Sequence, residues 1–284
     1  MRITNNITAL NTYRQYSANT VSTNKSMEKL SSGSRINRAA DDAAGLSISE
    51  KMRAQIRGLT QGTRNAQDGV SFLQTAEGAL TEVSDMLTRL KELSNQVTND
   101  SYSDDDQKNI GAEMSALGTA ITDIYTKTNF NGKSVFGGTT ADATAGLVVG
   151  SSSTNIKYGE GNGQTVTIAA ATITNVALLI VETNDAKTSA ADARAVTNAL
   201  VESAITEVNT QRSTYGAQQN QLEHAANNMA TTKENLQAAE SRVRDVDMAE
   251  EMMKYTKNNI LLQASQAMLA QANSQPQGVL QLLQ

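Results

Sequence analysis

The sequence has no cysteine, no tryptophan, a single histidine and a single proline among its 284 residues. Without cysteine, the chain cannot form disulfides, thiolate metal sites or a thiol nucleophile. The histidine, His224, has no nucleophile placed to pair with it, so a structural or exposed role is favoured over catalysis. The proline is Pro276, so residues 1–275 contain no obligatory helix break. We therefore expect long helices, no enzyme activity, no cofactor and no metal site.

Aromatic residues and net positive charge are also scarce. Aromatics make up 4% of the chain and hydrophobic residues 39%, which disfavours a broad globular core and favours an elongated helical architecture. The formal net charge of -5 argues against a general nucleic-acid binder. No apolar run reaches the roughly 20 residues that cross a bilayer, and the N-terminus lacks the apolar segment of a secretory signal. We expect neither membrane insertion nor conventional signal-peptide export.

Glycine, threonine and serine dominate the middle of the chain, from Phe130 to about Lys187, where no helical period is visible. The dipeptide Asn131-Gly132 predicts a β-hairpin because both residues tolerate a positive φ. Thr165 to Ile168 alternates with period two, and Val176 to Val181 is apolar and β-branched. These two segments predict one or two further short strands, with their pairing left open. The middle is therefore expected to be a non-helical insert.

The stretch from Asp42 to Asn99 carries a long heptad pattern. Its apolar residues are spaced alternately three and four apart, which is the spacing of a coiled-coil seam, with one polar slot at Ser94. A continuous helix of this length would extend roughly 90 Å at 1.5 Å per residue. The seam consists of Leu73, Ala76, Leu80, Val83, Leu87, Leu90, Ser94 and Val97.

Two further helices are expected after this one. Ser103 and Asp106 predict a capping box at the start of a shorter second helix. Ser189 and Asp192 predict another capping box, which begins a very long third helix after the insert. The second helix carries Ile110, Met114, Leu117, Ile121 and Ile124, and the third carries Val201, Val208, Tyr215, Leu222, Met229, Leu236 and Val243 at every seventh position.

Both ends of the chain are weakly apolar helices. The seventh-residue register shifts by three residues between Val243 and Val246, which marks a packing boundary. Residues 1–64 hold ten basic and four acidic side chains, whereas residues 234–254 hold six acidic and three basic ones. Because isolated helices are marginal in water, we expect the two ends to order by docking onto other copies. The patterns predict a mainly α fold: an elongated antiparallel helical bundle or coiled-coil rod formed by the N- and C-terminal segments, with a small β-hairpin-containing insert.

Motifs near both ends resemble the bacterial flagellin signature. Residues 35–46 read RINRAADDAAGL, and residues 265–273 read SQAMLAQAN, followed by QPQGVL at residues 275–280. Shorter blocks at residues 65–69, 239–249 and 257–261 agree with the same family. The resemblance covers roughly residues 1–136 and 189–284, and only the middle lacks a counterpart.

The resemblance implies a short flagellin without large outer domains. It assigns residues 1–40 with 246–284 to an inner core of terminal helices, residues 41–140 with 175–245 to a rod domain with the β-hairpin, and residues 141–174 to a short variable surface insert. It also implies a structural subunit that self-assembles into the extracellular flagellar filament for motility. The subunit would be exported unfolded through the flagellar type III system.

The same resemblance implies several partners. They are other copies of the chain, a flagellar export chaperone, the filament cap and hook-filament junction proteins. A head-to-tail contact that does not close on itself builds an open helical polymer, and the apolar residues of the terminal helices would supply that contact. The residues expected to serve polymerisation and chaperone binding are Ile3, Ile7, Leu10, Ile260, Leu261, Leu262, Met268, Leu269, Val279, Leu280, Leu282 and Leu283.

A vertebrate Toll-like receptor is a further partner that the resemblance implies. Flagellins that it recognises offer an Arg and a Leu on the long rod helix and a Glu on the short one. Arg89, Leu93 and Glu113 match these positions in this sequence. From the residues alone, the two charges read as ordinary solvated side chains on helix faces.

Two other readings remain open at this stage. A hook-filament junction protein of the same fold is the main alternative, although residues 265–283 are more similar to the filament subunit. A secreted effector or enzyme would have to fit its site into the roughly 50 residues of the middle, which is short for a stable core.

Overall fold

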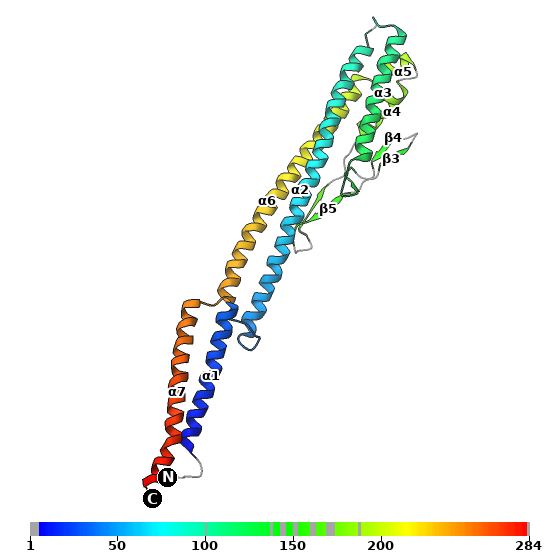
Figure 1. Ribbon diagram of the computed structural model, residues 1–284. Coiled ribbons are helices and arrows are strands. Elements are labelled where there is room, and N and C mark those ends of the chain that lie inside the picture. Colours follow the sequence, from blue (N-terminus) through cyan, green and yellow to red (C-terminus); the bar gives the residue numbers. More distant parts are fainter. Residues whose placement is uncertain are drawn as a thin grey trace. The chain divides into compact units, whose positions relative to one another are not determined.

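The computed structural model of the chain (Figure 1) describes residues 6–99, 101–136, 139–142, 146–149, 153–159, 163–168, 174–186 and 189–282. In residues 139–142, 146–149 and 276–282 only the backbone is described. The helices in these residues are α1 (Ile7–Ser32), α2 (Ala43–Val97), α3 (Asp104–Lys127), α4 (Thr174–Asp185), α5 (Ala190–Ala195), α6 (Asn198–Arg244) and α7 (Met248–Leu282). The strands are β1 (Asn129–Phe130), β2 (Lys133–Ser134), β3 (Thr139–Asp142), β4 (Gly146–Val149), β5 (Thr154–Lys157) and β6 (Thr165–Ile168).

The predicted mainly α fold is confirmed, and the chain divides into two compact units. Unit 1 comprises residues 1–56 with 234–284, and unit 2 comprises residues 57–233. Unit 1 therefore contains α1, α7, the start of α2 and the end of α6. These limits differ from the expected domain limits at residues 40 and 246, because the first turns of α2 and the last turns of α6 belong with the terminal helices.

The seam between α2 and α6 forms the core of unit 2. All eight predicted seam residues of α2 are at most 1% exposed, and those of α6 from Val201 to Met229 are at most 5% exposed. The two helices run antiparallel, since Lys91 pairs with Glu202 and Leu222 lies beside Gly69. The sequence prediction of a coiled-coil seam is confirmed. A helix pair with such a continuous apolar seam is stabilised within one chain.

The one polar residue of this seam has a hydrogen-bond partner. Ser94 is 1% exposed, and its hydroxyl donates to the Val196 carbonyl oxygen at 2.6 Å. Val196 lies between α5 and α6, where the chain is not helical. Here the sequence prediction is wrong: the Ser189 side chain caps α5, which has only six residues, and the long helix starts later, at Asn198. The hydrogen bond between the Ser94 hydroxyl and the Val196 carbonyl therefore holds the non-helical segment between α5 and α6 against α2.

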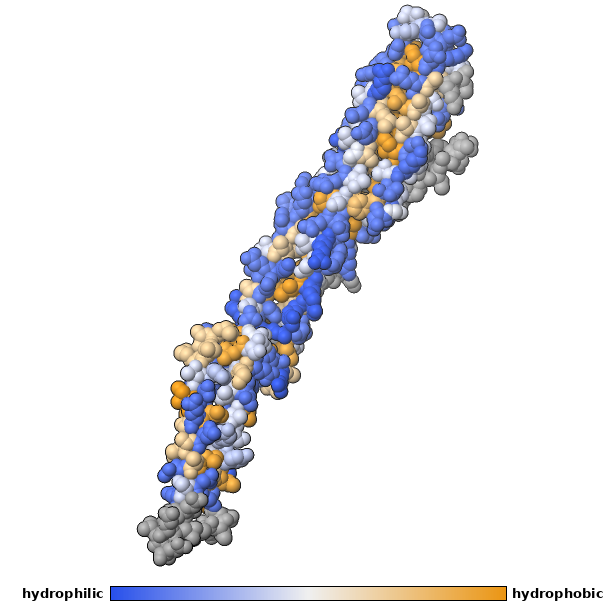
Figure 2. Space-filling view, viewed as in Figure 1, coloured by the Kyte–Doolittle hydropathy of each residue, from blue (hydrophilic) through white to orange (hydrophobic). Residues whose placement is uncertain are grey.

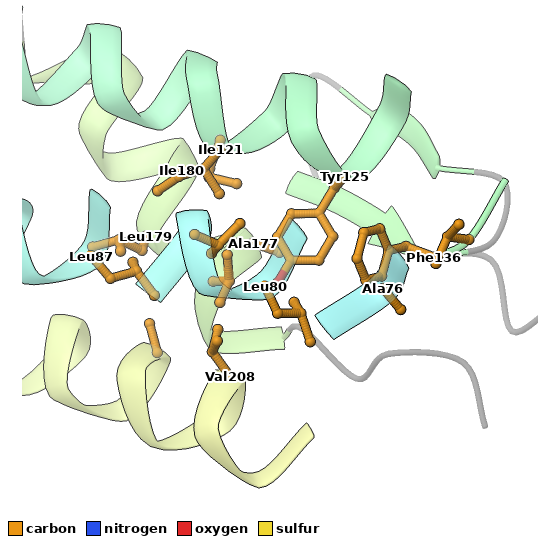
Figure 3. Close-up of a cluster of buried hydrophobic side chains, with 14 of the residues drawn as sticks. Ala76, Leu80, Leu87, Ile121, Tyr125, Phe136, Ala177, Leu179, Ile180 and Val208 are labelled. Carbon is orange, nitrogen blue, oxygen red and sulfur yellow. The ribbon is translucent and has the colours of Figure 1, made fainter. Parts of the chain in front are cut away.

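Helix α3 covers a second face of α2 and begins at the predicted capping box, in which Ser103 and Asp106 exchange hydrogen bonds. Figure 3 shows Tyr125 of α3 directed toward Leu80 of α2, and Ile121 of α3 beside Ile180 of α4. The ring of Tyr125 meets the ring of Phe136 edge-on, with 4.9 Å between their centroids. This contact anchors the chain that follows the hairpin to the helical core.

The predicted β-hairpin at Asn131-Gly132 is confirmed. Strands β1 and β2 pair antiparallel, with Phe130 opposite Lys133. Asn131 has φ 52° and Gly132 has φ 76°, which are the two positive values that a tight two-residue turn requires. The hairpin is held to α2, because the ring of Phe130 lies 5.8 Å from the ring of Phe72.

The predicted strand at Val176 to Val181 is wrong, because these residues belong to helix α4. A short apolar run does not distinguish a buried strand from a buried helix by periodicity alone. The carboxylate of Glu207, on α6, accepts hydrogen bonds from the backbone N–H groups of Thr174, Asn175 and Val176 at 2.9, 2.9 and 3.2 Å. These are the otherwise unpaired donors of a helix N-terminus. A distant carboxylate therefore fixes where α4 begins.

The predicted strand at Thr165 to Ile168 is confirmed as β6, paired antiparallel with β5. Val166 and Ile168 are 3% and 2% exposed, although both fall in the range 141–174 that the sequence analysis assigns to the surface. This hairpin lies directly against α2. A Cβ atom at Gly62 would overlap the carbonyl oxygen of Tyr158, just after β5, and Asn65 donates to the Lys157 carbonyl at 2.8 Å.

The close approach at Gly62 gives a stability prediction. Gly62→Ala should lower the free energy of unfolding by about 1–3 kcal/mol, because the added methyl displaces the Tyr158 backbone. Gly78→Ala, on the same helix, meets nothing within 4 Å and should raise it by about 0.5–1 kcal/mol. Urea unfolding of the unassembled variants, followed by far-UV circular dichroism, measures both. Equal effects of the two substitutions would contradict the proposed packing.

Candidate functional site

In unit 1, α1 lies antiparallel to α7 (Figure 1), and the segment that joins α1 to α2 pairs with the segment that joins α6 to α7. Helix α6 ends where the heptad register shifts, and the Val246 N–H donates to the Gly33 carbonyl at 3.1 Å. Arg35 donates from its backbone to the Arg244 carbonyl at 2.6 Å. Gly33 has φ 68°, a left-handed conformation that ends α1 at little cost for a glycine. These bonds tie the end of α1 to the start of α7.

The loop between α1 and α2 is organised by Asp41. Its carboxylate accepts from the backbone N–H groups of Asn37 and Arg38 at 3.3 and 3.2 Å, and it pairs with Lys25 at 2.7 Å. The hydrogen bond from Lys25, followed by the backbone bonds, lowers the pKa of Asp41 from 3.8 to about 2. The ionised carboxylate thus holds the segment that connects the two helices.

Among the described side chains of α1 and α7, the fully buried ones are small or polar. Thr23, Ser26 and Glu251 are 8%, 6% and 6% exposed, and Ala272 is 9% exposed. Asn19 donates across the interface to the Ser265 hydroxyl at 3.0 Å. Small side chains let the two backbones approach closely, with Cα atoms of α1 and α7 within 8 Å of each other. Such an interface buries little apolar area, so it adds little to the stability of the pair.

The large apolar side chains of unit 1 lie on its surface instead. Among the described residues of this unit, Ile36 is the only large apolar side chain that is buried. Figure 2 shows orange and pale orange residues on the surface of the α1–α7 unit. A large number of exposed apolar side chains on one unit is typical of a site for another protein. We call it the terminal apolar face, and it consists of Ile7, Leu10, Tyr13, Val21, Met27, Met248, Met252, Met253, Ile260, Leu261 and Met268, which are 41–68% exposed.

The residues expected to serve polymerisation differ in exposure. Ile7, Leu10, Ile260, Leu261 and Met268 are exposed on the terminal apolar face. Leu262 and Leu269 are half-buried. Ile3 and Leu283 lie outside the described residues, and the backbone alone is described at Val279, Leu280 and Leu282.

Sequence reasoning missed about half of the face. Tyr13 and Val21 lie on α1, and with Leu10 they line a shallow groove on that helix. Met248, Met252 and Met253 cluster at the start of α7. The sequence does carry a signal for these residues, which is a high density of apolar residues that follow no single heptad. A helix that is covered by partners on several sides needs apolar residues on several faces.

The residues expected to meet an immune receptor divide into two groups. Arg89 and Glu113 are about half exposed, and the guanidinium lies 2.9 Å from the carboxylate. Arg89 also pairs with Glu92 at 2.9 Å. Glu113, and then Glu92, raise the pKa of Arg89 above its ordinary value. Leu93 is 1% exposed in the core of unit 2, which contradicts the expectation that it forms part of a receptor-binding surface.

Within the residues that the structure describes, neither a metal-binding cluster nor a membrane-spanning helix is found. No cluster of three or more His, Asp or Glu side chains there is arranged to hold a metal ion. No helix in that part of the chain combines the length and the apolar character needed to cross a bilayer.

The fold and the terminal apolar face define a helical structural protein whose two ends pair with each other. The sequence profile of the bacterial flagellin N-terminal helical region matches residues 3–141, and that of the C-terminal helical region matches residues 199–283. The chain belongs to the bacterial flagellin family. Flagellins are structural subunits of the flagellar filament, an extracellular organelle of motility.

Individual relatives agree with this assignment along the whole chain. Flagellin of Bacillus subtilis strain 168 is 49% identical, with both chains covered completely. The flagellar filament 30.7 kDa core protein of Treponema maltophilum is 44% identical, again over the full length of both. A solved structure of a putative flagellar hook-associated protein from Vibrio parahaemolyticus shares the fold, with a TM-score of 0.58 over 72% of this chain and all of that chain. Its sequence identity is only 15%, so it shows the fold alone.

The Asp41 loop gives a pH prediction. Because the carboxyl has a lower pKa when folded than the ordinary 3.8, its contribution to stability is complete above about pH 4 and is lost as the pH falls toward about 2. The amide proton shifts of Asn37 and Arg38, followed by NMR, should titrate with a midpoint near 2. Lys25→Met removes the largest cause and should move the midpoint upward, and Asp41→Asn should abolish the titration. A wild-type midpoint near 3.8 would contradict this interpretation.

Proposed function

We propose that the chain polymerises into the filament by burying its terminal apolar face against other copies of itself. The observation that carries the proposal is the inverted burial of unit 1, in which small and polar side chains lie between α1 and α7 and large apolar ones face outward. Burying one such side chain in a neighbour contributes about 1.5–3 kcal/mol. A face of this size therefore supplies enough free energy for association after the cost of immobilising a subunit.

The arrangement also favours an open polymer over a closed dimer. The apolar residues of the face are distributed over several sides of α1 and α7, so one neighbour cannot cover them all. A subunit with several unlike neighbours makes heterologous contacts, which build helical assemblies. In this proposal, residues 1–40 and 246–284 form the inner core of the filament, residues 41–140 with 175–245 form the rod outside it, and residues 141–174 are its variable part.

The route to the filament follows from the same face. We propose that the chain leaves the cell unfolded through the flagellar type III system and is extracellular once assembled. An export chaperone would cover the apolar residues of α7 beforehand, and the cap and hook-filament junction proteins would contact the ends of the polymer. The alternative of a junction protein draws only on a shared fold at 15% identity, whereas filament proteins match at 44–49% along the full chain.

Substitution within the face tests polymerisation. Ile260, which is 61% exposed, contributes no contact that the monomer needs. Ile260→Ser should raise the critical concentration for seeded assembly about 10- to 100-fold, because it removes about 1.5–3 kcal/mol of burial per subunit. Gln263→Ser, three residues away on the same exposed helix, should change it by less than about threefold. Sedimentation and negative-stain electron microscopy measure the polymer.

A control on folding accompanies this test. Both variants should keep the far-UV circular dichroism and the urea unfolding transition of unit 2. Assembly of Ile260→Ser and of a chain lacking residues 1–38 and 246–284 at wild-type concentrations would refute polymerisation through the terminal helices.

Recognition by the vertebrate Toll-like receptor is a second proposal. It is supported by Arg89 and Glu113, which are exposed, lie on neighbouring helices α2 and α3 and form one charged pair. A planar guanidinium presented at the surface is a frequent anchor of protein interfaces.

The charged pair can be tested in binding to the purified receptor ectodomain. Arg89→Ala should weaken binding at least about tenfold, as expected for an anchor residue. Lys91→Ala, two residues along α2, removes an exposed charge that pairs with Glu202 and should leave receptor binding within about threefold of the wild type. Equal binding by Arg89→Ala and the unsubstituted chain would exclude this surface.

A further inference from the structure

The methionines differ widely in exposure, and two of those described, Met52 and Met86, are half-buried. The sequence contains ten. In unit 1, Met27, Met248, Met252, Met253 and Met268 are 50–68% exposed. In unit 2, Met114 and Met229 are 0% and 5% exposed. Exposure of a thioether matters chemically, because an accessible sulfur reacts with oxidants and a buried one is protected.

Four of the exposed methionines lie in the last turns of α1 and the first turns of α7. Met27 lies six residues before Gly33, and Met252 lies six residues after Val246, the two residues joined by a backbone hydrogen bond. Since α1 and α7 are antiparallel, Met27 and Met252 lie at the same level of the pair. Met248 lies one turn from Met252 on α7, and Met253 follows directly. We call Met27, Met248, Met252 and Met253 the methionine patch.

Methionine is the principal oxidisable side chain in this protein, because the sequence has neither cysteine nor tryptophan. A thioether sulfur attacks one oxygen of hydrogen peroxide, so that a sulfur–oxygen bond forms, the oxygen–oxygen bond breaks and water leaves. The sulfur is oxidised and the peroxide is reduced. The resulting sulfoxide is polar and accepts hydrogen bonds, so burying it against apolar side chains without a donor is unfavourable.

We propose that the methionine patch is a peroxide-sensitive modification site that controls assembly of the chain. Oxidation converts part of the terminal apolar face into a polar surface, and the modified subunit no longer adds to the polymer. The same methionines are shielded once neighbouring copies cover them. The inference rests on the proposed polymerisation and adds to it a chemical state of the subunit that permits or prevents addition.

The patch has the chemistry that makes such a switch reversible. Methionine fits irregular apolar interfaces because its chain is unbranched and its sulfur is polarizable. Leucine would fill a similar volume without this sensitivity. Methionine sulfoxide is reduced back to the thioether by methionine sulfoxide reductases, each specific for one epimer of the sulfoxide. A dithiol reductant supplies the two electrons and becomes a disulfide, and the sulfoxide oxygen leaves as water. Oxidation would therefore delay assembly without destroying the subunit.

The experiment treats the unassembled full-length chain with hydrogen peroxide and maps the oxidised residues by peptide mass spectrometry. The four patch methionines and Met268 should gain one oxygen before Met114 and Met229 do. Seeded assembly of the oxidised chain should then require at least about a tenfold higher concentration, which is the effect of losing the burial of about one side chain. Treatment with the two reductases should restore assembly, and preassembled filaments should resist oxidation at the patch.

Two variants assign the effect to the patch. The chain carrying Met27→Leu, Met248→Leu, Met252→Leu and Met253→Leu should assemble and lose most of its sensitivity to peroxide, with the remainder coming from Met268. Met268→Leu, an exposed methionine outside the patch, should stay sensitive. If the leucine variant fails to assemble, rescue of the oxidised wild-type chain by the reductases still tests the inference.

The outcomes separate this inference from the proposed function. Failure of the untreated wild-type chain to polymerise would refute the proposed function itself. Normal polymerisation of a chain oxidised at all four patch residues would overturn the inference alone. Undiminished peroxide sensitivity of the four-leucine variant, or equally rapid oxidation of the patch in assembled filaments, would overturn it as well.

Discussion

The arrangement of unit 1 depends on large apolar side chains of α1 and α7 that stay exposed among the residues that the structure describes. In unit 2, residues such as Leu80 and Val208 meet across a seam and are removed from water. In unit 1, that position is taken by Thr23 and Ser26, so side chains such as Ile260 remain exposed. Similar helical segments thus lead to a self-sufficient core in one unit and to an unsatisfied surface in the other.

Close approach of the terminal helices is what produces this surface. Small interface residues allow the two backbones to pack tightly and to exchange the hydrogen bond between Asn19 and Ser265. They bury too little apolar area to hold the pair strongly, since helical stability in proteins comes mostly from burial of an apolar face. Neighbouring copies that cover the face would supply the missing area. Binding to the folded state alone stabilises that state, so assembly and the stability of the terminal helices are linked.

The sequence predicts local features and misses those that arise from distant parts of the chain. The strict alternation of three and four residues in α2, the capping box at Ser103 and the turn at Asn131-Gly132 depend only on nearby residues, and all are confirmed. Helix α4 depends on a carboxylate some thirty residues away, at Glu207. Leu93 lies beside the main seam and is buried because α2 has a second covered face, which a single heptad does not reveal. The sequence identified only about half of the terminal apolar face, because its residues likewise do not follow a single heptad.

An apolar face that remains unsatisfied within its own chain imposes an order on its partners. If a chaperone, the cap and other copies all use the side chains of α7, only one of them can cover these residues at a time, because each excludes water from the same atoms. Transfer from one partner to the next then depends on the difference between their affinities and not on any change within the subunit. The polar interface between α1 and α7 is compatible with this exchange, since the pair can separate and form again without exposing a large apolar core.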